Sequence, residues 1–346
     1  MKVDKAYCMS SYLCFRYVEG ENVVFKEGVT HNDHALVPEE KKFPCKNAQD
    51  IDRYIKKILE SVDLSHAAIF LSGGMDSAIL ATYMPKGTKA YTTRCVGATA
   101  IDETAKARQF CEINGLEHIV IDVSWDDYMN TMDELMLRDG SPIIPNEPQA
   151  YVAAKRVSED GGKLIVYGDC ADTEFGGMSL LLSKDWDYDG WVHRFSFLEP
   201  EKVLKNAANV DKVYSQYRIG EHGIDYVKFI SEIYAKSASG ALTNAFEAAG
   251  MSYIDPYERL KMAKPLDLHR VRSGDSKYLI RDLFRMKYPT LEIPEKIPMG
   301  RPADEWMKDW RGPMRDEFIP GCVNSLTGEQ KLLVYSLERF LNLIEC

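Results

Sequence analysis

Strand-like and helix-like patterns alternate between residues 67 and 177, and this alternation constrains the fold more than any other feature of the sequence. Short apolar runs predict strands at 67–71, 89–96, 117–123 and 163–169. Apolar residues at helical spacing predict helices at 75–84, 102–116 and 148–161. Strands that alternate with helices form a parallel sheet, because each helix returns the chain to the start of the next strand. We therefore predict an α/β fold, with a parallel sheet flanked by helices.

The segments on either side of this core have different patterns. Residues 7–28 alternate like two strands around a Gly-Glu-Asn turn, so residues 1–45 are predicted to form a short N-terminal β ribbon. Residues 46–200 are assigned to the α/β core, which begins with an expected helix at 46–62. Residues 201–346 are predicted to be mainly helical and to complete the site. The helices expected in this last part are 201–210, 224–238, 276–288 and 327–345.

Composition and charge argue against several classes of protein. The 346 residues carry a formal net charge of −10, so nothing indicates a broad basic surface for nucleic acid. The longest apolar runs fall short of the ~20 residues that span a bilayer, and the N-terminus lacks a signal-peptide pattern. The eight cysteines form no Cys-x-x-Cys pair, which disfavours a zinc site or a redox dithiol. We therefore expect a cytoplasmic protein that binds neither nucleic acid nor membrane.

The turn after the first expected strand, Ser-Gly-Gly-Met-Asp-Ser at residues 72–77, has the composition of a phosphate site. Glycines let the backbone approach an anion closely, and the start of a helix directs N–H groups at it. Asp76 would repel a phosphate unless Mg²⁺ lay between the two groups. The turn is not a Walker A loop, because no lysine follows the glycines. A plain bend that begins a helix is the alternative, and we favour phosphate binding.

Four segments resemble one enzyme family. The hexapeptide SGGMDS after an apolar strand resembles the PP-loop of the N-type ATP pyrophosphatases, which cleave ATP between its α and β phosphates. Residues 163–177, KLIVYGDCADTEFGG, are similar to the S-G-E-G-[AS]-D-E-x-F-G-G segment of asparagine synthetases and β-lactam synthetases. Residues 273–284 and 295–307 are similar to the family's G-x-x-K-x-x-L-R and R-x-K-x-x-F-x-x-P-x-x-x-W runs. The resemblance covers about residues 50–310 and implies the PP-loop ATP pyrophosphatase fold, also called adenine nucleotide alpha hydrolase-like.

The resemblance also implies roles for individual residues. Mg²⁺ would be held by Asp76 and Asp172, and Lys296 stands where the family has its catalytic lysine. Asp169 replaces the family's Glu and would accept the amine proton. Nucleotide contacts are expected from Leu71, Ser72, Gly73, Gly74, Asp76, Ser77, Gly168 and Lys277. Lys277 and Arg281 would share a helix face, where they either reach the phosphates or face water. ATP and Mg²⁺ are the expected cofactors.

We predict an ATP-dependent amide-forming synthetase, similar to asparagine synthetase, that adenylates a small-molecule carboxylate and transfers ammonia or another amine to it. Glutamine-dependent asparagine synthetases carry a glutaminase domain whose cysteine follows the initiator methionine, and residue 2 here is Lys2. Nitrogen is therefore expected as free ammonia, from a separate glutaminase subunit, or from an amine on the substrate. Because Asp169 is one methylene shorter than Glu, a sugar uronate or a natural-product acid is an alternative acceptor to aspartate.

Two other classes of function stay open. A tRNA-modifying ATP pyrophosphatase shares the loop, but it typically needs a cysteine pair and a basic RNA-binding face, and this sequence shows neither. A non-catalytic nucleotide-binding regulatory subunit would have kept the fold alone. The joint presence of Ser72, Asp76, Asp172 and Lys296 argues against such loss of activity. A homo-oligomer is compatible with the sequence, which does not determine the assembly.

Overall fold

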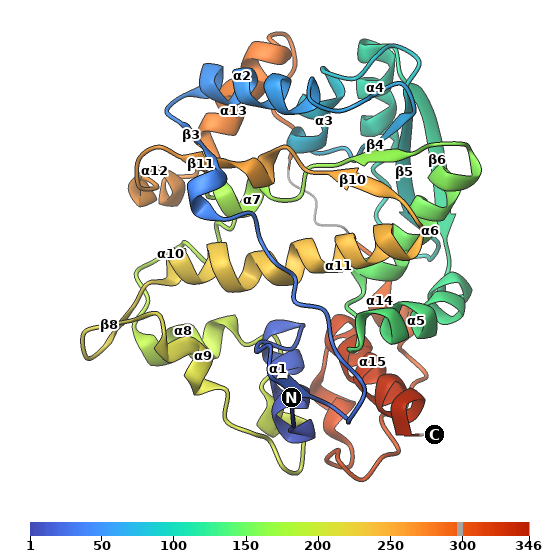
Figure 1. The fold of residues 1–346 in the computed structure, drawn as a ribbon, viewed down its shortest axis with the longest axis vertical. Coiled ribbons are helices and arrows are strands. Elements are labelled where there is room, and N and C mark those ends of the chain that lie inside the picture. The colour runs from blue at the N-terminus through green and yellow to red at the C-terminus, as the bar shows by residue number, and fades with distance from the viewer. Residues whose placement is uncertain (296–299, 346) are drawn as a thin grey trace.

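A five-stranded parallel sheet lies at the centre of the computed structural model, which describes residues 1–295 and 300–345 (Figure 1). The strand order is β10-β7-β4-β5-β6, and every neighbouring pair is parallel. The strands are β4 (Ala67–Phe70), β5 (Lys89–Cys95), β6 (Glu117–Val123), β7 (Leu164–Val166) and β10 (Ser252–Ile254). The predicted α/β fold and its four core strands are confirmed. The fifth strand, β10, comes from the part of the sequence that we expected to be mainly helical.

Helices cover both faces of the sheet (Figure 1). One face carries α2 (Ala48–Leu59), α3 (Met75–Ala81), α4 (Thr104–Asn114) and α13 (Tyr278–Lys287). The other face carries α5 (Trp125–Asp139), α6 (Asn146–Glu159) and α11 (Ala235–Ala248). Successive strand residues point to opposite faces, so Ala68 packs into the second core and Ile69 into the first. Burial on both faces explains why these strands are continuously apolar.

The N-terminal segment differs from the prediction. Residues Lys5–Phe15 form helix α1 in place of the first strand of the expected β ribbon. Asp4 caps this helix by accepting a hydrogen bond from the Tyr7 N–H at 3.1 Å. Every residue from Cys8 to Phe15 is buried, so the helix has no long polar face whose spacing would reveal it. The strands β1 (Lys2–Val3) and β2 (Val23–Val24) pair in parallel beside it.

The C-terminal part is largely helical, as expected, with one exception. Helix α15 (Gly328–Glu345) confirms the prediction for 327–345, and α10 (Tyr226–Phe229) leads through a π-helical turn into α11. The helix expected at 201–210 was wrong. Its backbone bonds to a distant segment instead, with the Lys205 N–H donating to the Glu317 carbonyl at 2.9 Å. The Ile319 N–H donates to the Val203 carbonyl at 2.8 Å, so this stretch uses its hydrogen-bonding groups outside any helix.

The remaining elements complete the chain. They are a 3₁₀ turn at Glu39–Lys41, β3 (Phe43–Cys45), α7 (Ala171–Glu174), α8 (Tyr188–Phe195), a 3₁₀ turn at Pro200–Lys202, α9 (Asp211–Ser215), β8 (Arg218–Ile219), β9 (Gly223–Ile224), a 3₁₀ turn at Tyr257–Arg259, β11 (Leu260–Met262), α12 (Leu268–Arg272), α14 (Ala303–Trp306) and a 3₁₀ turn at Cys322–Ser325. Strand β11 pairs in parallel with β3, so the N-terminal and C-terminal parts meet beside the sheet. The boundaries predicted at residues 45 and 200 stay predictions.

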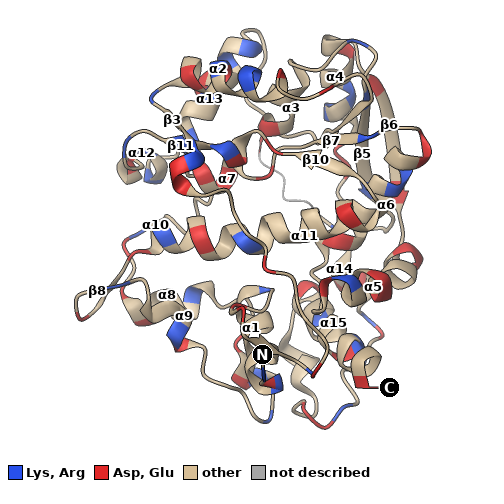
Figure 2. Ribbon diagram, viewed as in Figure 1, with Lys and Arg blue, Asp and Glu red and all other residues tan. Residues whose placement is uncertain are grey.

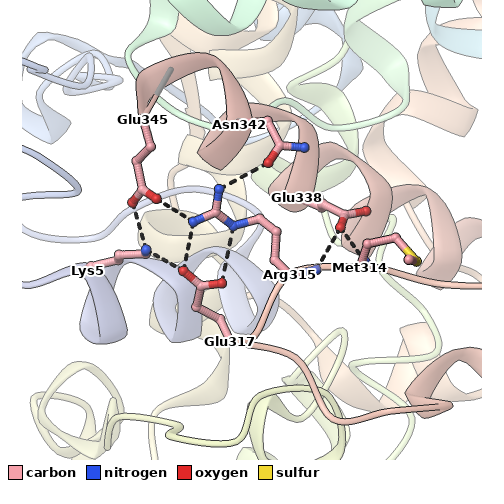
Figure 3. Close-up of polar contacts among 7 residues, drawn as sticks. All are labelled: Lys5, Met314, Arg315, Glu317, Glu338, Asn342 and Glu345. Atoms are coloured by element: carbon pink, nitrogen blue, oxygen red, sulfur yellow. Dashed lines mark hydrogen bonds and ion pairs between the residues drawn. The ribbon is translucent and has the colours of Figure 1, made fainter.

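A charged network fastens the N-terminal helix to the C-terminal helix (Figure 3). The Lys5 ammonium pairs with Glu317 and lies 2.6 Å from Glu345 Oε1. Arg315 donates to Glu317 Oε1 at 2.8 Å and to Asn342 Oδ1 at 3.0 Å, and it also pairs with Glu345. The Arg315 hydrogen bond holds the pKa of the Glu317 carboxyl at about 2, although partial burial opposes this.

Charges of both signs are interspersed along the helices that cover the sheet (Figure 2). Among the helices of the described residues, none is long and apolar enough to span a bilayer.

Candidate functional site

The 72–77 loop follows β4 at the carboxyl edge of the sheet, where parallel α/β folds bind their ligands. Leu71 fastens the start of the loop to β5. Its N–H donates to the Tyr91 carbonyl at 2.9 Å, and its carbonyl accepts from Thr92 Oγ1 at 2.6 Å. The loop then enters α3 at Met75. The sheet therefore holds the predicted phosphate loop in a fixed position.

The two hydroxyls of the loop contact each other. Ser72 Oγ lies 3.0 Å from Ser77 Oγ, and the Ser72 N–H donates to Ser77 Oγ at 3.1 Å. The Gly74 N–H donates to Ser72 Oγ at 3.1 Å. A side chain at Gly73 would place its Cβ 2.9 Å from Lys106 Cβ. The hydroxyls thus shape the loop, and the glycine lets α4 approach it closely.

Lys277 joins the two carboxylates that were predicted to hold a metal ion. Its Nζ lies 2.5 Å from Asp76 Oδ2 and 2.8 Å from Asp172 Oδ1. The residue is only 5% exposed and adopts a left-handed backbone conformation, with φ of 52°, at the start of α13. Burial lowers the pKa of Lys277, but attraction to Asp76 and Asp172 outweighs burial and leaves that pKa above its ordinary value. The structure therefore brings together three residues from distant parts of the sequence.

This arrangement fits a divalent cation. Two carboxylate oxygens lie within hydrogen-bond distance of one ammonium, so a positive group already occupies the position between them. A Cβ at Gly177 would lie 1.9 Å from Asp172 Oδ1, so a glycine is required beside this carboxylate. Residues 1–295 and 300–345 contain no cluster of three or more His, Cys, Asp or Glu side chains suited to a metal. Mg²⁺ commonly takes one or two carboxylates and completes its shell with phosphate oxygens and water.

The second predicted segment begins directly after β7. Gly168 packs between two side chains, because a Cβ there would lie 2.9 Å from both Leu80 Cδ1 and Tyr257 Cε2. Asp169 is half-buried, and Asp172 lies in the short helix α7. Lys296, the predicted catalytic lysine, lies outside the described residues. The roles assigned to Asp169 and Lys296 stay predictions.

Sequence reasoning missed three residues near this edge. Lys106 lies over Gly73, and both Asp255 and Tyr257 follow strand β10. Burial raises the pKa of Asp255 to about 7, although hydrogen bonds from backbone N–H groups lower it in part. An Asp-Pro pair after the short apolar run at 252–254 was the available signal, and it was overlooked because strands were not expected there. Arg281 lies one turn beyond Lys277 on α13.

Comparison with known families decides the assignment. The family model described as asparagine synthase matches residues 62–301, which is more than half of the chain. The chain belongs to the asparagine synthase family. This confirms the predicted resemblance, and it places the protein in a family of ATP-using, amide-forming synthetases.

One solved structure illustrates the similarities found. An NH3-dependent NAD synthetase from Campylobacter jejuni, in complex with the nitrate ion, is 14% identical in sequence. The match covers 56% of this chain and 94% of that one, with a TM-score of 0.28. Comparison with curated proteins finds no match.

Proposed function

We propose that this member of the asparagine synthase family adenylates a small-molecule carboxylate with ATP and transfers ammonia or another amine to it. The observation that carries the proposal is the convergence of Asp76 and Asp172 on one cation position beside the 72–77 loop. A site that handles ATP phosphates needs positive charge held between fixed carboxylates and a closely approaching backbone. Both requirements are met at this edge of the sheet.

The proposed first step activates the carboxylate. A substrate carboxylate oxygen attacks the α-phosphorus of ATP, the bond from the α-phosphorus to the bridging oxygen breaks, and pyrophosphate leaves. The 72–77 loop would orient the pyrophosphate, while Lys277 and, by family resemblance, Lys296 would bring positive charge to the phosphates. Asp76 and Asp172 would hold Mg²⁺, which when bound neutralises charge on phosphate oxygens.

The proposed second step forms the amide. The amine nitrogen attacks the acyl carbon, the bond between that carbon and the phosphate oxygen breaks, and AMP leaves. Asp169 would accept the proton that the nitrogen loses, since a carboxylate at this edge can act as a general base. Its side chain is one methylene shorter than the Glu of the family pattern, and a shift of about 1 Å is large for a positioned group.

The acceptor and the nitrogen source are proposed from the same residues. The shorter Asp169 favours an acid other than aspartate, such as a sugar uronate or a natural-product acid. Nitrogen would arrive as ammonia, from a separate glutaminase subunit, or from an amine on the substrate.

The test is ATP-dependent release of pyrophosphate by the purified protein with Mg²⁺. Aspartate and a panel of uronates and other carboxylic acids are supplied, each with and without ammonium, and the nucleotide product is identified. We expect AMP and pyrophosphate with at least one acid. Asp76→Asn and Asp172→Asn should each lower that rate by about 100-fold or more, whereas Asp50→Asn, at an exposed helix start distant in sequence, should not change it. Formation of ADP, or equal rates in all variants, would contradict the proposal.

A further inference from the structure

Strands β7 and β10 end together at the edge that carries the candidate site. Val166 pairs with Ile254 in the parallel register, so the residues that follow each strand leave the sheet side by side. The Tyr167 N–H donates to the Ile254 carbonyl at 3.2 Å and extends this pairing by one step. The chain after β7 carries Asp169 and Asp172, while the chain after β10 carries the turn Asp255-Pro256-Tyr257.

The Asp255 carboxylate holds the first of these segments through its backbone. Its Oδ2 accepts from the Asp169 N–H and from the Cys170 N–H, both at 2.8 Å. Its Oδ1 accepts from the Tyr257 N–H at 2.8 Å, which fixes the carboxylate within its own turn. Asp255 is only 2% exposed, so water does not compete strongly for these hydrogen bonds.

Tyr257 links the same turn to the phosphate loop. Its fully buried ring lies against Gly168, where a Cβ would be 2.9 Å from Tyr257 Cε2. Its hydroxyl donates to the backbone carbonyl of Asp76 at 3.0 Å. Only glycine at position 168 lets the ring pass between the two segments. One buried turn thus touches the backbones of Asp76 and Asp169, which belong to different loops.

We propose that Asp255 and Tyr257 are positioning residues, which set the distance between the Asp76 carboxylate and the 169–172 segment and so determine how tightly the site takes Mg²⁺-bound ATP. Neither side chain needs to touch the substrate for this role. The proposal rests on the proposed function for its kinetic test, and on the hydrogen bonds alone for its structural test.

Tyr257→Phe gives the sharpest kinetic test, because it keeps the ring and removes only the hydroxyl. Tyr288→Phe is a matched control, since Tyr288 is also buried and its hydroxyl donates to the Ala78 carbonyl of the same helix at 2.6 Å. We expect Tyr257→Phe to lower kcat/KM for Mg²⁺-ATP by between about 10-fold and 100-fold, mainly through KM. Tyr288→Phe should leave kcat/KM nearly unchanged, although both variants lose stability.

Asp255→Asn tests the other half of the turn without catalysis. The amide keeps the size of the side chain but replaces one acceptor with a donor, so at least one of the three N–H groups loses its partner. Amide hydrogen exchange in the peptide that contains Asp169 and Cys170 should become about tenfold faster or more, while exchange in the peptide that covers β6 stays as in the wild type.

The outcomes separate this inference from the proposed function. If the wild type releases no pyrophosphate with any acid, the proposed function fails, and Mg²⁺-dependent binding of a non-hydrolysable ATP analogue replaces kcat/KM as the readout for Tyr257→Phe and Tyr288→Phe. If Tyr257→Phe matches Tyr288→Phe in whichever readout applies, the turn only stabilises the fold and the inference is wrong. Unchanged exchange at Asp169 and Cys170 in Asp255→Asn would also overturn it.

Discussion

The Lys277 ammonium lies 2.5 Å from Asp76 Oδ2, although the two residues are 201 positions apart in the sequence. The same nitrogen lies 2.8 Å from Asp172 Oδ1. A buried lysine therefore neutralises the two carboxylates that we propose as metal ligands. Two carboxylates this close repel each other unless a cation stands between them. Mg²⁺ and Lys277 are thus expected to compete for the same pair of oxygens.

Replacement of Lys277 by methionine should expose this competition. Lys277→Met leaves two partly buried carboxylates without their cation, so we expect the free energy of unfolding to fall by about 3 kcal/mol without Mg²⁺. Added Mg²⁺ should then raise the melting temperature of the variant more than that of the wild type. Thermal unfolding with and without Mg²⁺ measures both effects.

The control for this experiment lies on the same helix. Lys287 Nζ pairs with Asp52 Oδ1 at 2.5 Å in a more exposed setting, so Lys287→Met should cost about 1 kcal/mol or less. Its melting temperature should respond to Mg²⁺ as that of the wild type does. Equal Mg²⁺ responses of Lys277→Met and the wild type would show that Asp76 and Asp172 do not bind the ion.

Asp169→Glu should change the use of the acceptor. The added methylene moves the carboxylate by about 1 Å, and a displacement of that size commonly lowers kcat/KM by a factor of about ten to a hundred. We expect such a loss with the enzyme's own acid, with Thr173→Ser as a nearby control that retains activity. Unaltered kcat/KM in Asp169→Glu would mean that this carboxylate is not positioned for the reaction.

Glu317 makes stability depend on pH at the acidic end. The Arg315 hydrogen bond lowers its pKa from 4.5 to about 2, so its stabilising effect is present above about pH 4.5 and is lost as the pH falls through about 2. Glu317→Gln should therefore be less stable than the wild type by about 1 kcal/mol at pH 7, a value reduced by solvent screening. The difference should disappear near pH 2 in urea unfolding experiments.

The buried acids Asp139 and Glu147 make stability depend on pH in the opposite direction. Burial raises the pKa of Asp139 from 3.8 to about 7, and burial together with Asp139 raises that of Glu147 well above its ordinary value. Raised pKa values favour folding at low pH, so stability should be full below about pH 4 and should fall as the pH rises through about 7. Urea unfolding at pH 5 and pH 8 measures this loss.

Glu147→Gln removes one of the two charges. The variant should lose less stability than the wild type between pH 5 and pH 8, because Asp139 no longer has a buried acidic neighbour. Glu112→Gln, at an exposed position, should follow the wild type. If Glu147→Gln also follows the wild type, the two carboxyl groups are not coupled.

The sequence was sufficient to predict the parallel sheet and the meeting of Asp76 with Asp172. Both depend on local signals, since apolar runs mark the strands and the carboxyl ends of parallel strands meet at one edge. Helix α1 was mistaken for a strand, because a helix buried on nearly all sides lacks polar spacing. Asp255 and Tyr257 could not be placed without the pairing of β10 with β7, which joins segments far apart in the sequence.

Transfer of labelled oxygen is the measurement that tests adenylation most directly. The acid that supports pyrophosphate release is labelled with ¹⁸O in its carboxylate, turned over with ATP and the amine, and the nucleotide is analysed by mass spectrometry. If the carboxylate attacks the α-phosphorus, AMP carries one labelled oxygen from the acid. Unlabelled AMP, or label in inorganic phosphate beside ADP, would contradict the proposed function.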